Sequence, residues 1–154
     1  MTPFRSLSLR VAGLALMLGL GTAQAAPTCQ DAAAAVNRDT GRQLDERQLA
    51  DVLVSLNLSG RLPDSFVTKR EAREAGWRPG RSLWSVQALY GKSIGGDRFG
   101  NRERRLPIDG WREADLDYRG GKRNAKRLLF ADSGRRFVTV DHYQTFREIP
   151  PCRR

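Results

Sequence analysis

The stretch Trp111-Arg112-Glu113-Ala114-Asp115-Leu116-Asp117-Tyr118 decides the fold, because its residues alternate with a period of two. Such alternation is typical of a β-strand with one buried face. One face of this strand carries Trp111, Glu113, Asp115 and Asp117. The other face carries Ala114, Leu116 and Tyr118. We expect the face with the three carboxylates to lie towards solvent or a cleft.

A basic turn follows this strand, and the chain's only histidine comes after it. The turn spans residues 119–127, and the histidine lies in Asp141-His142-Tyr143-Gln144-Thr145-Phe146. A carboxylate, an imidazole and several guanidinium groups on one sheet would supply a general base, a general acid and cationic binders of phosphate. The plainer alternative is a structural histidine, with Glu113 in an ion pair with Arg123 or Arg127.

Helices are expected before this strand. Residues 44–58 carry Leu49, Val52, Leu53 and Leu56 at the 3-4 spacing of an amphipathic helix, which ends near Gly60. Thr68-Lys69-Arg70-Glu71 matches a capping box and predicts a short helix that stops at Gly76. Residues 26–41 are Ala-rich and polar, and their structure is left unassigned.

Further strands are predicted over residues 90–99, 125–130, 136–140 and 144–149, with a turn at Asp132-Ser133-Gly134. Gly95-Gly96 is expected to loosen the first of them. A single helical turn is expected near Ser82-Leu83-Trp84. This order predicts an α+β fold with amino-terminal helices packed on a twisted antiparallel β-sheet.

The first 25 residues have the composition of a secretory signal peptide. Arg5 and Arg10 precede the apolar residues 11–20, and the small residues of Thr22-Ala23-Gln24-Ala25-Ala26 follow. We expect cleavage after Ala25, then an amino-terminal extension over residues 26–43 and one domain over residues 44–154. A retained membrane anchor is disfavoured, because the apolar run is too short to span a bilayer. The protein is therefore expected to be exported, to the periplasm or the extracellular space.

The chain is strongly basic, with a formal net charge of +10. Removal of Arg5 and Arg10 with the signal peptide would leave +8. Such a charge favours a polyanionic partner, whether a nucleic acid, an anionic membrane or an acidic polysaccharide. Of the 27 basic residues only 4 are lysine, and arginine favours bidentate contact with phosphate.

Cys29 and Cys152 are the only cysteines, and they lie near the two ends of the exported chain. An oxidising compartment favours a disulfide between them. Neither cysteine belongs to a recognisable nucleophile motif with the histidine, which disfavours a catalytic thiol. Two cysteines and one histidine also disfavour a zinc site.

Several motifs lie in one order along residues 48–149. They are Leu62-Pro63-Asp64 with Thr68-Lys69, Gly91-Lys92-Ser93-Ile94-Gly95-Gly96-Asp97, Asn101-Arg102-Glu103, Trp111-Arg112-Glu113-Ala114-Asp115, Arg123-Asn124 and Asp141-His142-Tyr143-Gln144-Thr145-Phe146. In this order they resemble the barnase and binase family of secreted bacterial ribonucleases, which prefer guanine. The resemblance implies the microbial ribonuclease fold, a ribonuclease domain over residues 44–154, and catalysis without a metal or other cofactor.

The resemblance also implies roles for individual residues. Glu113 resembles the family's general base and His142 its general acid in forming a 2′,3′-cyclic phosphate and then opening it with water. Tyr143 matches an aromatic residue that shapes the phosphate site. The cations that stabilise charge on the phosphoryl oxygens are matched by Lys69, Arg123 and Arg127. An exposed lysine without a role remains the alternative for Lys69.

Base selection is assigned by the same resemblance to the loop after Phe99. Glu103 resembles the carboxylate that accepts hydrogen bonds from guanine N1–H and N2–H₂, and backbone N–H groups near Asn101 and Arg102 would meet O6. Phe99 and Tyr143 are the aromatic candidates for packing around the base and phosphate. The alternative for Arg102 is a solvated charge. Asp97 and Asp115 are expected to be structural partners of arginines and turn amides.

This chain departs from barnase at a few places. Gly100 stands where barnase has serine, the connection before Trp111 is shorter, and Lys122 replaces an aromatic residue. These departures bear on the strictness of guanine selection and on recognition by an inhibitor. The expected partners are single-stranded RNA and an acidic, barstar-like inhibitor protein, for a monomer that binds no membrane after signal cleavage. The alternative function is a basic RNA- or polyanion-binding protein without turnover.

Overall fold

The computed structural model describes residues 25–154, so the signal-peptide prediction lies outside the described residues except for Ala25. The helices are α1 (Cys29–Asp39), α2 (Glu46–Ser59), α3 (Lys69–Glu74) and the 3-10 segments η1 (Leu83–Ser85) and η2 (Gln87–Leu89). The strands are β1 (Phe66–Val67), β2 (Ser93–Arg98), β3 (Arg112–Asp115), β4 (Arg127–Phe130), β5 (Arg136–Thr139) and β6 (Arg147–Glu148). Within residues 25–154 no helix combines the length and the apolar character that crossing a membrane requires.

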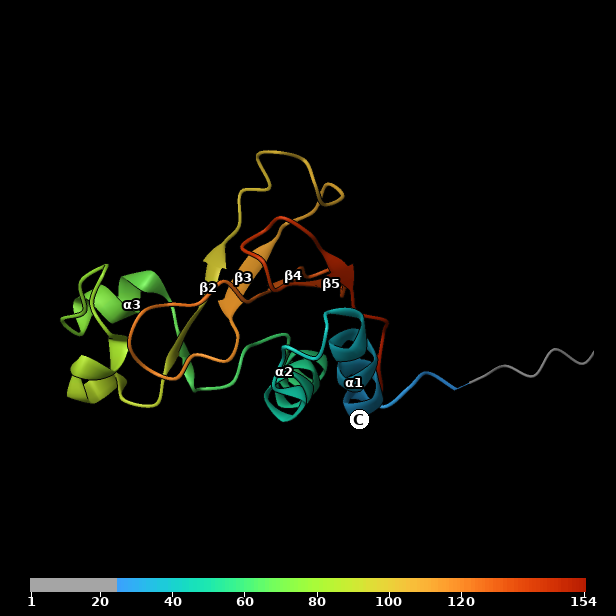
Figure 1. Cartoon of the computed structure of the whole chain (residues 1–154), viewed down its shortest axis with the longest axis horizontal. Coiled ribbons are helices and arrows are strands. Elements are labelled where there is room, and N and C mark those ends of the chain that lie inside the picture. The colour runs from blue at the N-terminus through green and yellow to red at the C-terminus, as the bar shows by residue number, and fades with distance from the viewer. Residues whose placement is uncertain (1–24) are drawn as a thin grey trace, which may run out of the picture.

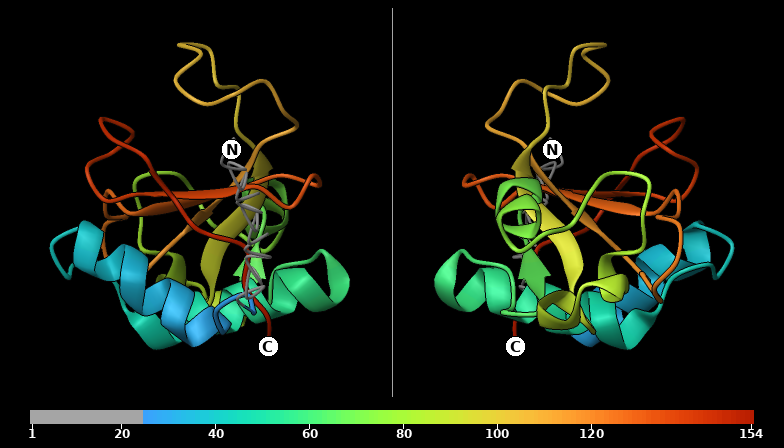
Figure 2. Two further views of the ribbon diagram at one scale, coloured as in Figure 1. Left: turned by 90° about the vertical axis from the view of Figure 1, so that its right-hand side faces the viewer. Right: turned by 90° about the vertical axis from the view of Figure 1, so that its left-hand side faces the viewer.

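The strands form one sheet in the order β1-β2-β3-β4-β5-β6. Neighbouring strands from β2 to β6 are antiparallel, whereas β1 pairs with β2 in parallel. Helices α1 and α2 cover one face of the sheet, and the long loops after β2 and β5 rise on the other side (Figures 1 and 2). The α+β prediction is confirmed. The parallel strand β1 was not predicted, because two residues are too few to show a period.

Helix α2 confirms the helix predicted over residues 44–58. Its apolar stripe is buried and packs into the largest core cluster of the described chain. Asp45 caps its first turn by accepting a hydrogen bond from the Gln48 amide. The helix ends at Gly60, whose φ of 67° lies in the left-handed region that favours glycine.

Helix α1 fills part of the segment left unassigned by sequence reasoning. Thr28 and Asp31 form a capping box at its start. Its buried face consists largely of small side chains, including Ala32 and Ala33, and packs in the same core cluster as α2. The segment expected to be an extension therefore contributes to the core of the domain.

Helix α3 begins at the predicted capping box. The Thr68 hydroxyl accepts from the Glu71 amide, and the Glu71 carboxylate accepts from the Thr68 amide. The Lys69 amide donates to Asp97 Oδ2 at 2.9 Å, which joins the start of the helix to β2. Asp97 is thus a partner of a backbone amide, as expected.

Gly95 itself is closely packed in β2, whereas the loosening expected at Gly95-Gly96 takes the form of an irregularity at Gly96. A Cβ atom at this position would lie 2.7 Å from Phe66 and 3.0 Å from Ala114. Only glycine allows β1 and β3 to approach this closely on either side. The sheet irregularity falls between Gly95 and Asp97, where the pairing register with β3 shifts.

The face of β3 that was expected to lie towards solvent or a cleft is not open to solvent, although Glu113 on it does line a cleft. Trp111 is 1% exposed, Glu113 8% and Asp115 2%. Trp111 packs with Leu129 and Phe137 in a second core cluster on this side of the sheet. Both faces of the strand are therefore covered, and the carboxylates on it need partners within the protein.

The disulfide between Cys29 and Cys152 is present, as predicted. It joins the first turn of α1 to the carboxyl-terminal segment, where Thr28 and Arg153 also form an isolated β-bridge. The Asn57 side chain of α2 donates to the Cys152 carbonyl at 2.8 Å. The residues around Cys29 and the carboxyl-terminal segment are thereby fixed to the helical layer.

The turn after β5 is organised by the carboxylate of Asp141. It accepts hydrogen bonds from the Thr139 hydroxyl at 2.8 Å, the Thr145 amide at 2.9 Å and the Thr145 hydroxyl at 2.6 Å. Burial acts to raise the pKa of Asp141, but the hydrogen bonds from Thr145 and Thr139 outweigh it and lower this pKa to about 2. The turn therefore depends on an ionised Asp141.

Replacement of both cysteines by serine should destabilise the fold without changing its topology. The bridge spans 123 residues. Loss of this cross-link should lower the free energy of unfolding by about 4–5 kcal/mol in the chain-entropy model. Guanidinium-induced unfolding of the oxidised wild type and the double variant measures the difference. A loss below about 1 kcal/mol would contradict a stabilising role for the bridge.

Asp141→Asn should destabilise the protein in a pH-dependent way. The folded-state pKa of Asp141 is depressed, so its contribution is fully present above the unfolded-state value near 3.8 and is lost as pH falls towards about 2. The difference in urea-unfolding free energy between wild type and variant should be constant from pH 7 to pH 5 and narrow below about pH 4. The exposed Asp51, which makes no side-chain hydrogen bond within the described residues, supplies the control Asp51→Asn. A difference that does not change with pH would contradict this role.

Candidate active site

Glu113 lies in the middle of β3 with a partner on each carboxylate oxygen. Lys69 Nζ lies 3.2 Å from Oε1, and the Tyr143 hydroxyl donates to Oε2 at 2.5 Å. Neither Arg123 nor Arg127 forms the ion pair with Glu113 that was considered as an alternative. The carboxylate is thus oriented by one residue from α3 and one from the turn after β5.

Tyr143 remains a hydrogen-bond donor to Glu113. Burial raises the pKa of its hydroxyl well above the usual value, and the hydrogen bond to the Glu113 carboxylate raises it further. Its ring stacks on Phe99, with centroids 5.3 Å apart and planes 20° apart. The Tyr143 amide donates to the Thr139 hydroxyl at 3.0 Å, which fixes the residue to the end of β5.

His142 projects from the turn after β5 and is exposed. Its φ of 56° and that of Tyr143, 68°, both lie in the left-handed region. Two successive non-glycine residues in this conformation are costly, so the surrounding contacts must hold them. The His142 amide donates to the Ala125 carbonyl at 3.1 Å, and Asp141 closes the turn from the other side.

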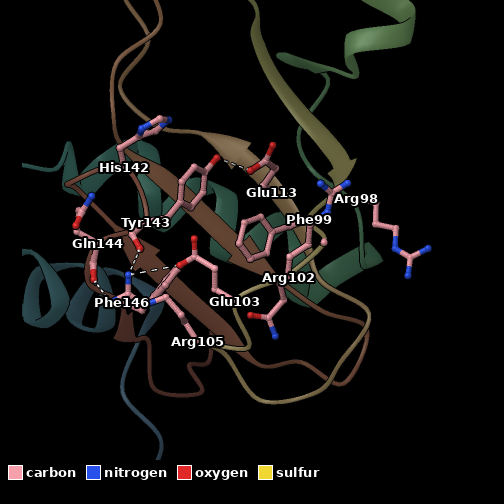
Figure 3. Close-up of a pocket in the computed structure, with 12 residues that line it drawn as sticks. Arg98, Phe99, Arg102, Glu103, Arg105, Glu113, His142, Tyr143, Gln144 and Phe146 are labelled. Carbon is pink, nitrogen blue, oxygen red and sulfur yellow. Dashed lines mark hydrogen bonds and ion pairs between the residues drawn. The ribbon is translucent and has the colours of Figure 1, made fainter.

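Glu113 and His142 line the same cleft. Figure 3 shows Tyr143 between the two residues, hydrogen-bonded to Glu113 and beside the imidazole, with 5.1 Å between the His142 and Tyr143 rings. The cleft has a volume of about 830 Å³. Its other lining residues include the predicted Phe99, Asn101, Arg102, Glu103 and Tyr143. The sequence therefore predicted most residues of one surface hollow.

The three predicted cations lie beside this cleft rather than in its lining. Lys69 reaches it through Glu113. Arg123 donates to Asp115 through Nε at 2.6 Å and through Nη2 at 2.7 Å, and Arg127 Nε lies 3.0 Å from the same carboxylate. The hydrogen bond to Asp115 raises the pKa of Arg123. Asp115 has the expected structural role.

Arg127 differs from the other two cations in its burial. Its side chain is only 4% exposed, and Nη1 donates to the Asn124 and Lys126 carbonyls. It therefore holds Asp115 and the basic turn from within the protein. Its position on β4, directly opposite Asp115 in the pairing register, explains this arrangement.

The loop after β2 is closed by Asn101. Its side chain donates to the Leu106 carbonyl at 2.7 Å and accepts from the Leu106 amide at 3.1 Å, so it replaces a pair of backbone hydrogen bonds. Its φ of 42° is one that asparagine tolerates better than most residues. The Glu103 side chain, predicted to read the base, is 81% exposed on this loop.

Arg105 is a residue of the cleft that sequence reasoning missed. Its guanidinium donates to the Tyr143 and Gln144 carbonyls and lies 4.0 Å from the Glu103 carboxylate (Figure 3). It thereby connects the loop that carries Glu103 to the turn that carries His142. Three arginines occur among residues 102–105, and nothing in their spacing distinguishes the one that makes this contact.

This arrangement places a carboxylate and an imidazole around one hollow, with cations at its edge. These groups are suited to proton transfer to and from an anionic substrate. Residues 25–154 contain no group of three His, Cys, Asp or Glu side chains placed to hold a metal ion. The exposed carboxylate of Glu103, in the wall of the cleft, offers two hydrogen-bond acceptors to a bound group.

Known proteins with related sequences are ribonucleases. The ribonuclease family model matches residues 51–150. A ribonuclease of Heyndrickxia coagulans is 43% identical over 104 residues, which are 66% of this chain and 92% of that protein. Ribonucleases of Bacillus intermedius and Bacillus pumilus are also 43% identical over 104 residues, or 62% of their lengths.

A solved structure of ribonuclease Sa2 with guanosine-2′-cyclophosphate is 26% identical and covers 60% of this chain and 90% of its own, with a TM-score of 0.33. The family model alone covers well over half of the chain. This match and the 43% identity to bacterial ribonucleases show that the chain belongs to the ribonuclease family, as a microbial ribonuclease of the barnase and binase type.

Proposed function

We propose that this ribonuclease is an exported endonuclease that cleaves single-stranded RNA on the 3′ side of guanosine. The observation that carries the proposal is the placement of Glu113 and His142 in one cleft whose wall also contains Glu103. The first two residues have the chemistry of a base and an acid, and the third has the chemistry to select a base. The cleavage would form a 2′,3′-cyclic phosphate, which water then opens.

In the first step Glu113 removes the proton from the ribose 2′-hydroxyl. The 2′-oxygen attacks the adjacent phosphorus, the bond from phosphorus to the 5′-oxygen breaks, and His142 gives its proton to the departing oxygen. In the second step His142 removes a proton from water and the water oxygen attacks phosphorus. The bond from phosphorus to the 2′-oxygen breaks, and Glu113 returns a proton to that oxygen, which leaves a 3′-phosphate. No step requires a metal or another cofactor.

The nearby cations would stabilise the negative charge that builds on the phosphoryl oxygens. The Lys69 side chain is 31% exposed, and the Arg123 side chain, which binds Asp115, is 29% exposed. The side chains of Lys69 and Arg123 are therefore accessible to a bound phosphate. Arg127 is buried, so we assign it a positioning role that it exerts through Asp115 and Arg123. Tyr143 orients the base and packs beside the phosphate.

Glu103 is proposed to accept hydrogen bonds from guanine N1–H and N2–H₂, while backbone N–H groups near Asn101 and Arg102 donate hydrogen bonds to guanine O6. The closed loop supports this assignment, because the hydrogen bonds between Asn101 and Leu106 fix its backbone. Phe99 supplies an aromatic surface at the same end of the cleft, stacked on Tyr143. An adenine would present a different donor pattern to the same carboxylate.

Export and the remaining partners are part of this proposal. The disulfide fits an oxidising compartment outside the cytoplasm, and residues 1–25 have the composition of a signal peptide. We propose a monomer that binds single-stranded RNA and, after signal cleavage, no membrane. An acidic, barstar-like inhibitor is the protein partner whose charge complements the cations around the cleft.

Glu113→Ala and His142→Ala should each abolish most cleavage of a guanosine-containing oligoribonucleotide in EDTA. Loss of a general acid or base lowers the rate by on the order of 10²–10⁴-fold. Initial rates with a fluorescent oligonucleotide measure the effect, and the all-deoxy oligonucleotide should remain intact because it lacks the 2′-hydroxyl.

Glu74→Ala is the matched control for this experiment. Glu74 is an exposed carboxylate that pairs with Arg70 on α3, away from the cleft. This variant should cleave at the wild-type rate. Full activity in either site variant would contradict the assigned roles, and salt-sensitive RNA binding by a wild type without turnover would favour a binding protein instead.

Glu103→Gln should weaken the preference for guanosine while leaving cleavage after adenosine unchanged. A hydrogen bond to a charged group contributes about 1.5–3 kcal/mol, so kcat/KM for a GpU dinucleotide should fall roughly 10–100-fold. Comparison of GpU with ApU in wild type and variant separates specificity from catalysis. An equal fall for both dinucleotides would indicate that Glu103 acts on the chemistry or on the fold rather than on the base.

A further inference from the structure

Three arginines and one phenylalanine form a row across four strands of the sheet. The pairing register places Arg98 opposite Arg112, Arg112 opposite Phe130, and Phe130 opposite Arg136. Directly paired residues project from the same face of a sheet, and Phe130 belongs to the core between the sheet and helices α1 and α2. Arg112, Phe130 and Arg136 therefore lie on the helix-covered face, opposite to Glu113, whereas the exposed Arg98 at the end of β2 lines the cleft of Glu113. Like charges so close together are unfavourable unless something compensates them.

Arg136 is the most unusual member of this row. It is 8% exposed, and its side chain makes one hydrogen bond within the described chain, from Nη1 to the Leu53 carbonyl at 3.4 Å. No carboxylate of residues 25–154 lies within 4.0 Å of it, whereas the neighbouring Arg135 pairs with Glu148. Burial alone lowers the pKa of Arg136, without an opposing contribution from an acidic neighbour. The other N–H groups of Arg136 keep some contact with solvent, but no carboxylate offsets the cost of burying most of the residue.

Arg136 and Arg112 line a common cavity of about 100 Å³. Phe130, Leu56 and Gly60 form other parts of its wall. The Arg112 guanidinium lies 4.9 Å above the Phe130 ring and donates one of its N–H groups to Asp132. Its other N–H groups have no hydrogen-bond partner within the part of the chain that the structure describes. Asp132 also lines the cavity, so two guanidinium groups and one carboxylate leave a net positive charge around this small hollow.

The cavity is separate from the catalytic cleft. The two hollows share no lining residue. Adjacent residues of a strand point to opposite faces, so Arg112 and Glu113 project to opposite sides of β3. The helices lie on one side of the sheet, and the loops that carry Glu103 and His142 lie on the other (Figure 2).

We propose that this cavity is a second anion site that binds a phosphate group between Arg112 and Arg136. Its size admits a few water molecules or one tetrahedral oxyanion but not a nucleobase. Guanidinium groups match the oxygens of phosphate through paired N–H donors. The phosphate comes either from free inorganic phosphate or from the backbone of a nucleic-acid strand outside the cleft. This site does not depend on the proposed cleavage reaction.

The test is a titration of the oxidised protein with inorganic phosphate at constant ionic strength, followed by amide NMR. The amides of Gly60, Asp132 and Gly134 should shift saturably in the wild type, and those of Gly100 and His142 report separately on the cleft. Arg136→Met should weaken binding at the cavity amides roughly 10–100-fold, because one charged hydrogen-bonding group is lost. The cleft amides should respond as in the wild type.

Arg135→Met is the matched control, since it removes a neighbouring arginine that pairs with Glu148 and does not line the cavity. It should retain the cavity response. Replacement of a buried ion by an apolar residue of similar volume is often neutral or stabilising, so Arg136→Met should fold. In chloride its thermal midpoint should equal or exceed that of the wild type. In phosphate only the wild type and Arg135→Met should gain stability from the cavity.

An all-deoxy oligonucleotide distinguishes the two sources of phosphate. Shifts of the cavity amides with both probes would identify a strand-binding site, and shifts with inorganic phosphate alone would identify a site for the free anion. Two results would overturn the proposal. One is the absence of a saturable shift at the cavity amides of the wild type. The other is an unchanged shift in Arg136→Met, which would assign this arginine only to its contact with the Leu53 carbonyl.

Discussion

The two contacts on the Glu113 carboxylate depend on α3, β2 and the turn after β5. Lys69 comes from the first turn of α3, which the Asp97 carboxylate joins to β2. Tyr143 comes from a turn that Asp141 closes and whose backbone the Thr139 hydroxyl holds. A carboxylate on a strand with both faces covered must find such partners, since its isolated burial would cost several kcal/mol. The same requirement that stabilises the fold therefore orients the proposed base.

Local signals in the sequence predicted the parts of the fold that have local causes. The capping box at Thr68 depends on a hydrogen-bond pair between residues three apart, and the stripe on α2 depends on helical periodicity. The capping box at Thr28 has a similar pattern with Asp31 in place of glutamate, and it was overlooked in an Ala-rich segment. Strand β1 and the close fit at Gly95 have no local cause. Both follow from the approach of strands distant in sequence.

The candidate site, too, has some features that local sequence patterns predict and others that depend on contacts between distant residues. Periodicity placed Glu113 and Asp115 on one face of β3, but it could not show that Trp111, Leu129 and Phe137 would cover that side. The assembly of Lys69 with Glu113, 44 residues apart, was anticipated only from motifs shared with a family. Arg105 was missed because its role depends on backbone carbonyls at Tyr143 and Gln144. A carbonyl acceptor has no signature in the sequence.

A net charge of +10 overstates how much positive surface the protein offers to a polyanion. Arg123 and Arg127 share the Asp115 carboxylate, and Arg119 pairs with Asp45. Arg136 is an exception, because no carboxylate within 4.0 Å compensates its charge and its side chain makes one hydrogen bond, to the Leu53 carbonyl, within residues 25–154. Position 136 faces the core beside Phe130, where an apolar side chain would pack without a desolvation cost. The phosphate that we propose in the adjacent cavity would supply the negative charge that Arg136 lacks within residues 25–154.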